Sequence, residues 1–170
     1  MKKFIITTLR EYLNEDYKIV DSSDFKDALL DLATLDLEDD QVRYPKIGNR
    51  TQSYLFGGSN YDLYILDRDE LPTSGSFEII IENNDKDIIG FIRGTKNENI
   101  ISINLIHIKE DYRGNGIGTE IYENFLNDGY IIKSDTEITD STYSLYDRMV
   151  IYGYTPIIFD DDRVGLKKDN

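Results

Sequence analysis

The sequence predicts a single α/β domain over residues 1–170, in which antiparallel hairpins are followed by alternating helices and strands. The main observation is that apolar, β-branched runs at 77–81, 88–93 and 100–108 are separated by short turns, as in consecutive hairpins. The last run leads through a glycine-rich loop, residues 113–118, into a helical apolar pattern. The length suits one domain with its own core, and no internal repeat or linker divides the chain.

The N-terminal part is predicted to contain two helices and a short strand. Residues 3–15 place apolar side chains on one helical stripe, and residues 19–20 suggest a short strand. The run at 21–24 offers several helix N-caps before a second periodic stretch, residues 25–32.

Residues 42–76 are predicted to be irregular apart from a strand at 61–66, because prolines and glycines interrupt them repeatedly. A segment of this length is too long for a simple connector. We therefore expect it to form loops on the substrate side of the domain.

After the glycine-rich loop, the pattern alternates between helix and strand. The predicted elements are a helix over 117–126, a strand over 130–133, a helix over 141–150 that ends before Gly153, and strands over 157–159 and 164–166.

The loop itself, Arg113-Gly114-Asn115-Gly116-Ile117-Gly118, predicts an anion-binding site. The first N–H groups of a helix lack intrahelical partners, and the helix dipole favours negative charge there. Glycines let a phosphate approach the backbone, and Arg113 adds a positive guanidinium. Together these features suggest a cradle for a diphosphate.

Two common phosphate loops fit this stretch less well. A P-loop requires Gly-Lys followed by Ser or Thr, which occurs nowhere in the chain. A dinucleotide-binding G-x-G-x-x-G loop would need glycine where Thr119 stands, and a repeated βαβ framework around it. The pattern R-x-x-G-x-G, in contrast, matches Arg113, Gly116 and Gly118 position by position.

This hexapeptide, with a strand before it and a helix after it, resembles the acetyl-CoA loop of the GNAT-type N-acetyltransferases. The order of elements over residues 77–166 is also similar to that family's order. The resemblance implies a mixed, mostly antiparallel sheet flanked by helices and splayed open after the fourth strand. It implies acetyl-CoA as co-substrate and transfer of the acetyl group to a primary amine by direct attack in a ternary complex.

The resemblance assigns the cofactor contacts to two stretches of backbone. Ile106, His107 and Ile108 would pair with the pantetheine arm. The pyrophosphate would be held by the amides of the loop, namely those of Arg113, Gly114, Asn115, Gly116, Ile117 and Gly118. On the simpler interpretation, the glycines only permit a tight turn.

In this family a tyrosine on the helix after the fifth strand often protonates the leaving thiolate. Tyr146 is the most similar position, and Tyr143 lies one turn earlier. The spacing departs from the family's commoner pattern L-Y-x-x-x-G-[FY], because Gly153 lies seven residues beyond Tyr146. A tyrosine that only packs in the core is the alternative.

A catalytic base is harder to assign. No Asp or Glu lies between Asn99 and Lys109, on the strand where the family frequently carries one. His107, the only histidine, has a suitable pKa class, although a lone histidine on a strand is often simply packed and hydrogen-bonded. Asp135, after the fifth strand, either faces the acceptor or shapes a turn. A non-catalytic CoA-binding or protein-interaction member of the same fold is therefore the alternative function.

The composition limits the partners. The net charge of -14 disfavours nucleic acid and anionic membranes, and it favours a cationic small molecule or a protein amine as acceptor. The acidic cluster at 36–40 either attracts such a cation or forms a solvated face. Cysteine is absent, which excludes disulfides, and no metal is expected because Asp160–Asp162 lacks calcium-loop spacing. Without a signal peptide or an apolar run of about 20 residues, the expected location is the cytoplasm. The sequence does not indicate an oligomeric state.

The N-terminal stretch TLREYLNE resembles the capsid-targeting segments of internal head proteins in large tailed phages. Those segments are removed after Leu-x-Glu, which Leu13-Asn14-Glu15 would match. On this alternative, residues 1–15 are removed and the protein lies inside the virion.

Overall fold

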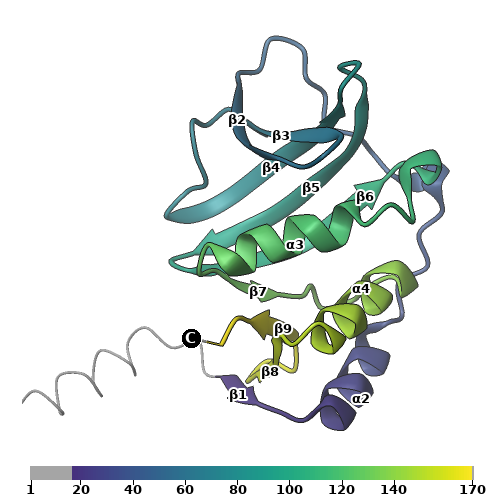
Figure 1. Ribbon diagram of the computed structural model, residues 1–170, viewed down its shortest axis with the longest axis vertical. Coiled ribbons are helices and arrows are strands. Elements are labelled where there is room, and N and C mark those ends of the chain that lie inside the picture. Colours follow the sequence, from purple (N-terminus) through teal and green to yellow (C-terminus); the bar gives the residue numbers. More distant parts are fainter. Residues whose placement is uncertain (1–16, 170) are drawn as a thin grey trace, which may run out of the picture.

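The computed structural model describes residues 17–169, and the strands found there form one nine-stranded sheet (Figure 1). The strands are β1 (Tyr17–Ile19), β2 (Gln52–Gly57), β3 (Tyr61–Leu66), β4 (Ser74–Asn83), β5 (Ile88–Asn97), β6 (Ile100–Ile108), β7 (Ile131–Lys133), β8 (Thr155–Phe159) and β9 (Val164–Lys167). Their order across the sheet is β1-β8-β9-β7-β6-β5-β4-β3-β2. Within the described residues only β6 and β7 pair in parallel, so the sheet is mixed and mostly antiparallel, as predicted.

The consecutive strands β4, β5 and β6 form the two hairpins that the sequence predicts. Each is rich in isoleucine, a β-branched residue that favours the half-buried surface of a sheet. The β4–β5 ladder runs from Ser74↔Asn97 to Glu82↔Ile88, and β5 then pairs with β6 along its length. The predicted turn near Asn83 is present, since its side chain accepts from the amides of Asp85 and Asp87 at 3.0 and 2.9 Å.

Within residues 17–169, three α-helices flank the sheet and share one apolar cluster with it (Figure 1). They are α2 (Ser22–Leu32), α3 (Ile117–Asn127) and α4 (Asp140–Ile151). The predicted cap of α2 is present, because the side chain of Asp21 accepts from the amide of Asp24 at 2.8 Å. Three aromatic rings form a row in which Tyr146 of α4 is in the middle. Its ring centroid lies 6.3 Å from that of Phe25 of α2 and 5.8 Å from that of Tyr122 of α3. This row joins the three helices.

The prediction of irregular chain over residues 42–76 is wrong for β2 and for the start of β4. β2 pairs with β3 as an edge hairpin, and a bulge shifts the register between Tyr54 and Phe56. Because of the bulge, Leu55 and Phe56 both pack against the core, although they are neighbours in sequence. The strand therefore lacks the strict alternation by which strands are predicted. The substrate-side role of residues 42–76 stays a prediction.

The sheet opens between β6 and β7, which is the opening expected after the strand that leads into the glycine-rich loop. Of the residues of β6, only Ile100–Ser102 pair with β7. The rest of β6 has no strand partner on that side within the described sheet. The register with β5 shifts at the same place, since Gly94 faces Ile103 and Arg93 faces Leu105. Asn104 is therefore an extra residue in β6, and such a bulge bends a strand away from its neighbour.

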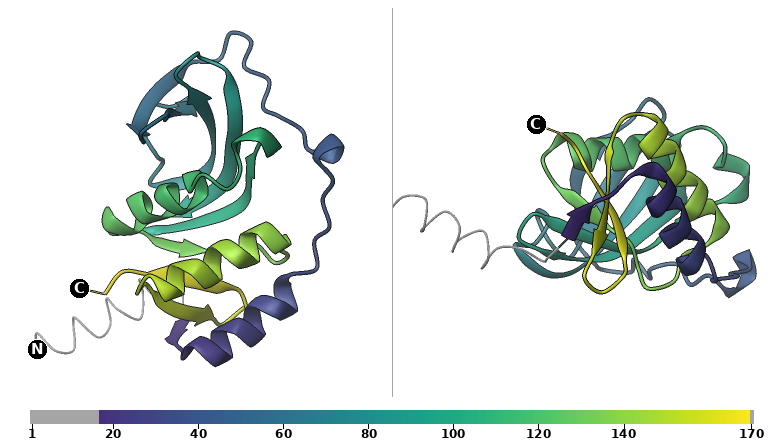
Figure 2. Two further views of the ribbon diagram at one scale, coloured as in Figure 1. Left: turned by 45° about the vertical axis from the view of Figure 1, so that its right-hand side comes forward. Right: turned by 90° about the horizontal axis from the view of Figure 1, so that it is seen from below.

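The chain between α2 and β2 runs along the side of the molecule past this opening (Figure 2). It includes the 3₁₀ turn η1 (Asp39–Gln41), which Glu38 and Gln41 cap reciprocally. The amide of Leu35 donates to the carbonyl of Ile138 at 3.1 Å, and the ring of Tyr44 packs on Phe91 with centroids 4.8 Å apart. This crossing segment thereby borders the functional region described below.

The predicted helix over residues 3–15 and the proposed cleavage after Leu13-Asn14-Glu15 lie outside the described residues.

Candidate active site

The glycine-rich loop forms the predicted connection between β6 and α3. After β6 the chain makes a short 3₁₀ turn, η2 (Glu110–Tyr112), and α3 begins at Ile117. Gly114 and Gly116 have φ values of 77° and 79°, in the left-handed region that glycine adopts without strain. Gly116 is the N-cap of α3, and no described side chain caps this helix end. The first amides of α3 are thus free of side-chain partners, as an anion site requires.

Gly118 lies where α3 approaches both β6 and α4. A Cβ atom placed there would stand 3.6 Å from Leu145 Cδ2 and 3.9 Å from the Cδ1 atoms of Ile106 and Ile108. Its backbone needs no glycine, and a Cβ atom there would already be in van der Waals contact with these side chains. A larger side chain would therefore press against α4 and β6.

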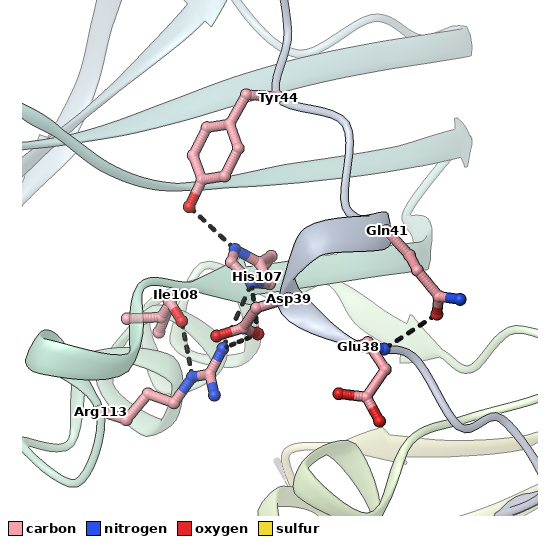
Figure 3. A network of polar contacts seen from close by, with 7 residues as sticks. All are labelled: Glu38, Asp39, Gln41, Tyr44, His107, Ile108 and Arg113. Carbon is pink, nitrogen blue, oxygen red and sulfur yellow. Dashed lines mark hydrogen bonds and ion pairs between the residues drawn. The ribbon is translucent and has the colours of Figure 1, made fainter.

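Arg113, the first residue of the loop motif, turns back toward the end of β6 (Figure 3). Its Nε donates to the carbonyl of Ile108 at 2.7 Å, and its Nη2 pairs with Asp39 Oδ1 at 2.6 Å. The guanidinium therefore ties the loop both to β6 and to the crossing segment. Asp39, from the acidic cluster that the sequence suggests as a solvated face or a cation attractor, is instead the partner of this arginine.

His107 occupies the centre of the same network (Figure 3). Its Nε2 lies 3.2 Å from Asp39 Oδ1, and its Nδ1 lies 2.9 Å from the hydroxyl of Tyr44. Nε2 also lies 3.2 Å from Arg113 Nη2; because a carboxylate only accepts and a guanidinium only donates, Nε2 of a neutral ring bonds to only one of these two groups at a time. Both ring nitrogens are engaged and the side chain is only 10% exposed. To accept a proton from an amine, His107 would have to exchange one of these bonds; its role as base stays a prediction.

Tyr146 lies in the core, away from the network around His107. Its side chain is fully buried against Phe25 and Tyr122, and its hydroxyl has no hydrogen-bond partner among the described residues. Burial raises the pKa of this phenol well above its ordinary value. This placement fits the packing interpretation readily, and the role of Tyr146 as acid stays a prediction.

A small pocket lies at the opening between β6 and β7. Its wall combines the bulged part of β6, α3, the start of α4 and the crossing segment; the lining residues are Leu35, Ile103, Asn104, Leu105, Ile106, Tyr122, Glu137, Ile138, Thr139 and Thr142. The tyrosine that reaches the pocket is thus Tyr122, with Tyr146 behind it.

Glu137 is the carboxylate among the residues that line this pocket, and no sequence pattern points to it. The sequence points instead to Asp135, whose Oδ1 accepts from the amide of Thr136 at 2.8 Å within the turn. The only sequence feature that could have indicated Glu137 is its position shortly after the predicted strand 130–133. Which of the two acids faces the pocket depends on the conformation of the turn, which no sequence pattern specifies.

Among residues 17–169, no three or more histidine, aspartate or glutamate side chains are grouped so that they could hold a metal ion. No helix of that part is long and apolar enough to cross a membrane.

The model of the acetyltransferase (GNAT) family matches residues 37–129, which is more than half of the chain. This protein therefore belongs to the GNAT acetyltransferase family. The matched range begins in the crossing segment and ends just after α3, and it includes the opening of the sheet and the glycine-rich loop.

The comparison with solved structures gives matches of low identity and low TM-score, three of which follow. An acetyltransferase of the GNAT family from Staphylococcus aureus is 16% identical, with a TM-score of 0.41, over 89% of this chain and 97% of that chain. The PaiA N-acetyltransferase of Thermoplasma acidophilum, solved with coenzyme A, is 16% identical with a TM-score of 0.39, over 56% and 62%. A GNAT family N-acetyltransferase of Escherichia coli, also solved with CoA, is 17% identical with a TM-score of 0.33, over 48% and 47%. No curated protein matches the chain.

The network of Figure 3 predicts a low pKa for Asp39. Hydrogen bonds from Arg113 and then from His107 lower this pKa from its ordinary value of 3.8. The ionised carboxylate holds the network together above that value, and the bonds are lost as the pH falls through the lowered pKa. We expect a carboxyl-detected NMR titration to show Asp39 titrating below 3.8, and to show a shift back toward 3.8 in Arg113→Gln.

Arg43→Gln is the matched control, because Arg43 donates to the backbone carbonyl of Asp40 and not to Asp39. An Asp39 pKa that is the same in Arg113→Gln and in the wild type would contradict the ion pair.

Proposed function

We propose that this protein transfers the acetyl group of acetyl-CoA to a primary amine. The observation that carries the proposal is the position of the uncapped α3 amino end directly beside the open edge of β6. An anion cradle next to a stretch of strand with unpaired backbone suits a long co-substrate that has a diphosphate at one end and an amide-containing arm at the other.

The proposed contacts follow from this juxtaposition. The amides of residues 113–118 would hold the diphosphate, and the backbone of Ile106, His107 and Ile108 would pair with the pantetheine arm as an added strand. The first of these stretches ends at Gly118, beside Ile106 and Ile108 of β6, and the second begins at the pocket. The thioester would then lie in or near the opening of the sheet.

The reaction is a direct acyl transfer. The amine nitrogen attacks the thioester carbonyl carbon, a C–N bond forms, the C–S bond breaks, and the amine loses a proton while the thiolate gains one. Backbone N–H groups of β6 beyond Ser102 are the proposed donors to the oxyanion, because β7 does not pair with them.

Glu137 is the proposed contact for the acceptor amine. It lines the pocket beside Asn104 and Thr139, and the protein's net charge favours a cationic acceptor. A carboxylate there can hold the ammonium form of the amine and pass its proton to solvent once the nitrogen is placed for attack. Polyamines, aminoglycosides and lysine peptides are the acceptor classes to screen.

A non-catalytic member of the family, which binds CoA or another protein, is the second candidate. Two observations favour it. Tyr146 is fully buried, and the pattern L-Y-x-x-x-G counted back from Gly153 places Met149 at the tyrosine position. A thioether cannot donate a proton, so this helix offers no ordinary acid at that point. CoA binding without turnover on any amine would favour this candidate.

The cofactor site is tested first by calorimetric titration with acetyl-CoA, with NAD and ATP as control ligands. We expect acetyl-CoA alone to bind, and Gly118→Glu to abolish binding, because its side chain would displace the amino end of α3 from Leu145 and β6 and would add negative charge at the loop. Asn127→Glu adds the same charge at the far end of α3 and serves as the control. Unchanged affinity in a folded Gly118→Glu variant would refute this location of the cofactor.

The proposed acid is tested by Tyr146→Phe in steady-state kinetics. Loss of a general acid lowers kcat by about 10²- to 10⁴-fold with little change in KM. Tyr152→Phe, at a tyrosine that is 57% exposed, is the control. A Tyr146→Phe variant with normal kcat would assign this residue to the core, where its unpaired hydroxyl contributes nothing favourable.

The acceptor contact is tested by Glu137→Gln. Removing the charge is expected to raise KM for the amine about tenfold or more, since hydrogen bonds to charged groups are the strong ones, while the affinity for acetyl-CoA stays the same. Asp135→Asn removes an equal charge two residues away and keeps the acceptor of the turn. Equal KM values in the two variants would exclude Glu137 from the acceptor site.

A further inference from the structure

Arg148 of α4 lies beside the amino end of α3. Its Nη1 donates to Thr119 Oγ1 at 3.0 Å, and Thr119 is the third residue of α3. Thr119 is only 8% exposed, whereas Arg148 is exposed to solvent. The bond therefore crosses from one helix to the other next to Gly118, where the glycine-rich loop ends.

The charge of Arg148 is uncompensated, in contrast to that of most arginines in the described residues. Ion pairs with aspartate or glutamate neutralise four others: Arg50, Arg93, Arg113 and Arg163. Within residues 17–169 Arg148 has no ion pair, although the chain has 33 acidic residues. Its one bond there, to a neutral hydroxyl, leaves most of the five guanidinium N–H donors available.

Arg113 does not provide the free cation that the loop motif suggests. Its Nε is bonded to Ile108 and its Nη2 to Asp39, so its charge is balanced within the network of Figure 3. A diphosphate at the loop would therefore contact backbone amides and Arg113, whose positive charge is already balanced by Asp39. Arg148 bonds to the third residue of α3 and is the nearby arginine that, among the described residues, has no ion pair and has unused N–H donors.

We propose that Arg148 binds the diphosphate of acetyl-CoA and extends the backbone cradle of α3 with a charged fork from α4. This inference rests on the proposed function, because it takes acetyl-CoA as the ligand of the loop. Guanidinium groups recognise phosphate oxygens through paired N–H donors, which a lysine does not reproduce. The bond to Thr119 holds the guanidinium at the helix end before the ligand arrives.

The test is calorimetric titration of wild type, Arg148→Gln and Arg148→Lys with three ligands: acetyl-CoA, its 3′-dephospho form and S-acetylpantetheine, which lacks the diphosphate. We expect Arg148→Gln to weaken binding of the first two ligands about 10- to 100-fold, the range for hydrogen bonds to charged groups, and to leave S-acetylpantetheine unaffected. Arg148→Lys should recover only part of the loss. Arg43→Gln, which removes an exposed arginine outside any ion pair, should bind all three as wild type does.

The other outcomes are equally decisive. Wild-type affinity for acetyl-CoA in Arg148→Gln would overturn the inference while leaving the proposed function intact. A loss that disappears with the 3′-dephospho ligand would overturn it too, because the contact would then be to the 3′-phosphate. An equal loss for S-acetylpantetheine would show that Arg148 only supports the fold. Absence of acetyl-CoA binding to the wild type would instead refute the proposed function.

Discussion

The separation of β6 from β7 creates the space around which the candidate site is built. Three residue pairs hold the two strands in parallel at Ile100–Ser102, and the extra residue Asn104 then turns β6 away. Backbone groups that would otherwise complete a ladder are left without a strand partner, and a buried N–H or C=O without a partner is costly. A strand edge of this kind either meets solvent or binds an extended ligand. The pocket, the glycine-rich loop and the amino ends of α3 and α4 all lie around this one opening.

The crossing segment between α2 and β2 gives the opening a second wall. Leu35 lines the pocket, and a few residues later Asp39 and Tyr44 bond to Arg113 and His107. The acidic residues of this segment are therefore not a uniform solvated face. One of them balances the arginine of the loop motif, and this balance is why the charge on Arg148 gains importance in a strongly acidic protein.

Several parts of the site were predictable because they depend on local rules. The hairpins follow from β-branched runs divided by turns, and the cap of α2 follows from Asp21 ahead of an apolar period. The loop was predictable because Gly114 and Gly116 supply backbone angles that other residues adopt only with strain. β2 was not, because its bulge brings Leu55 and Phe56 to the core and removes the alternation on which strand prediction relies. His107 was singled out, but its partners Asp39 and Tyr44 lie more than 60 residues earlier, beyond the reach of any spacing rule.

The glycine-rich loop and the elements on either side of it can be predicted from the residues alone, because they are properties of short contiguous stretches, and the family follows from the match over residues 37–129. Which side chains meet depends on how distant elements pack together. The tertiary structure buries Tyr146 in the aromatic row that joins the helices, brings Glu137 into the pocket and sets Arg148 against Thr119. The physical reason is the same in each case: burial, ion pairing and access to a ligand depend on distances between elements, and these distances arise only when the whole sheet and its helices pack together.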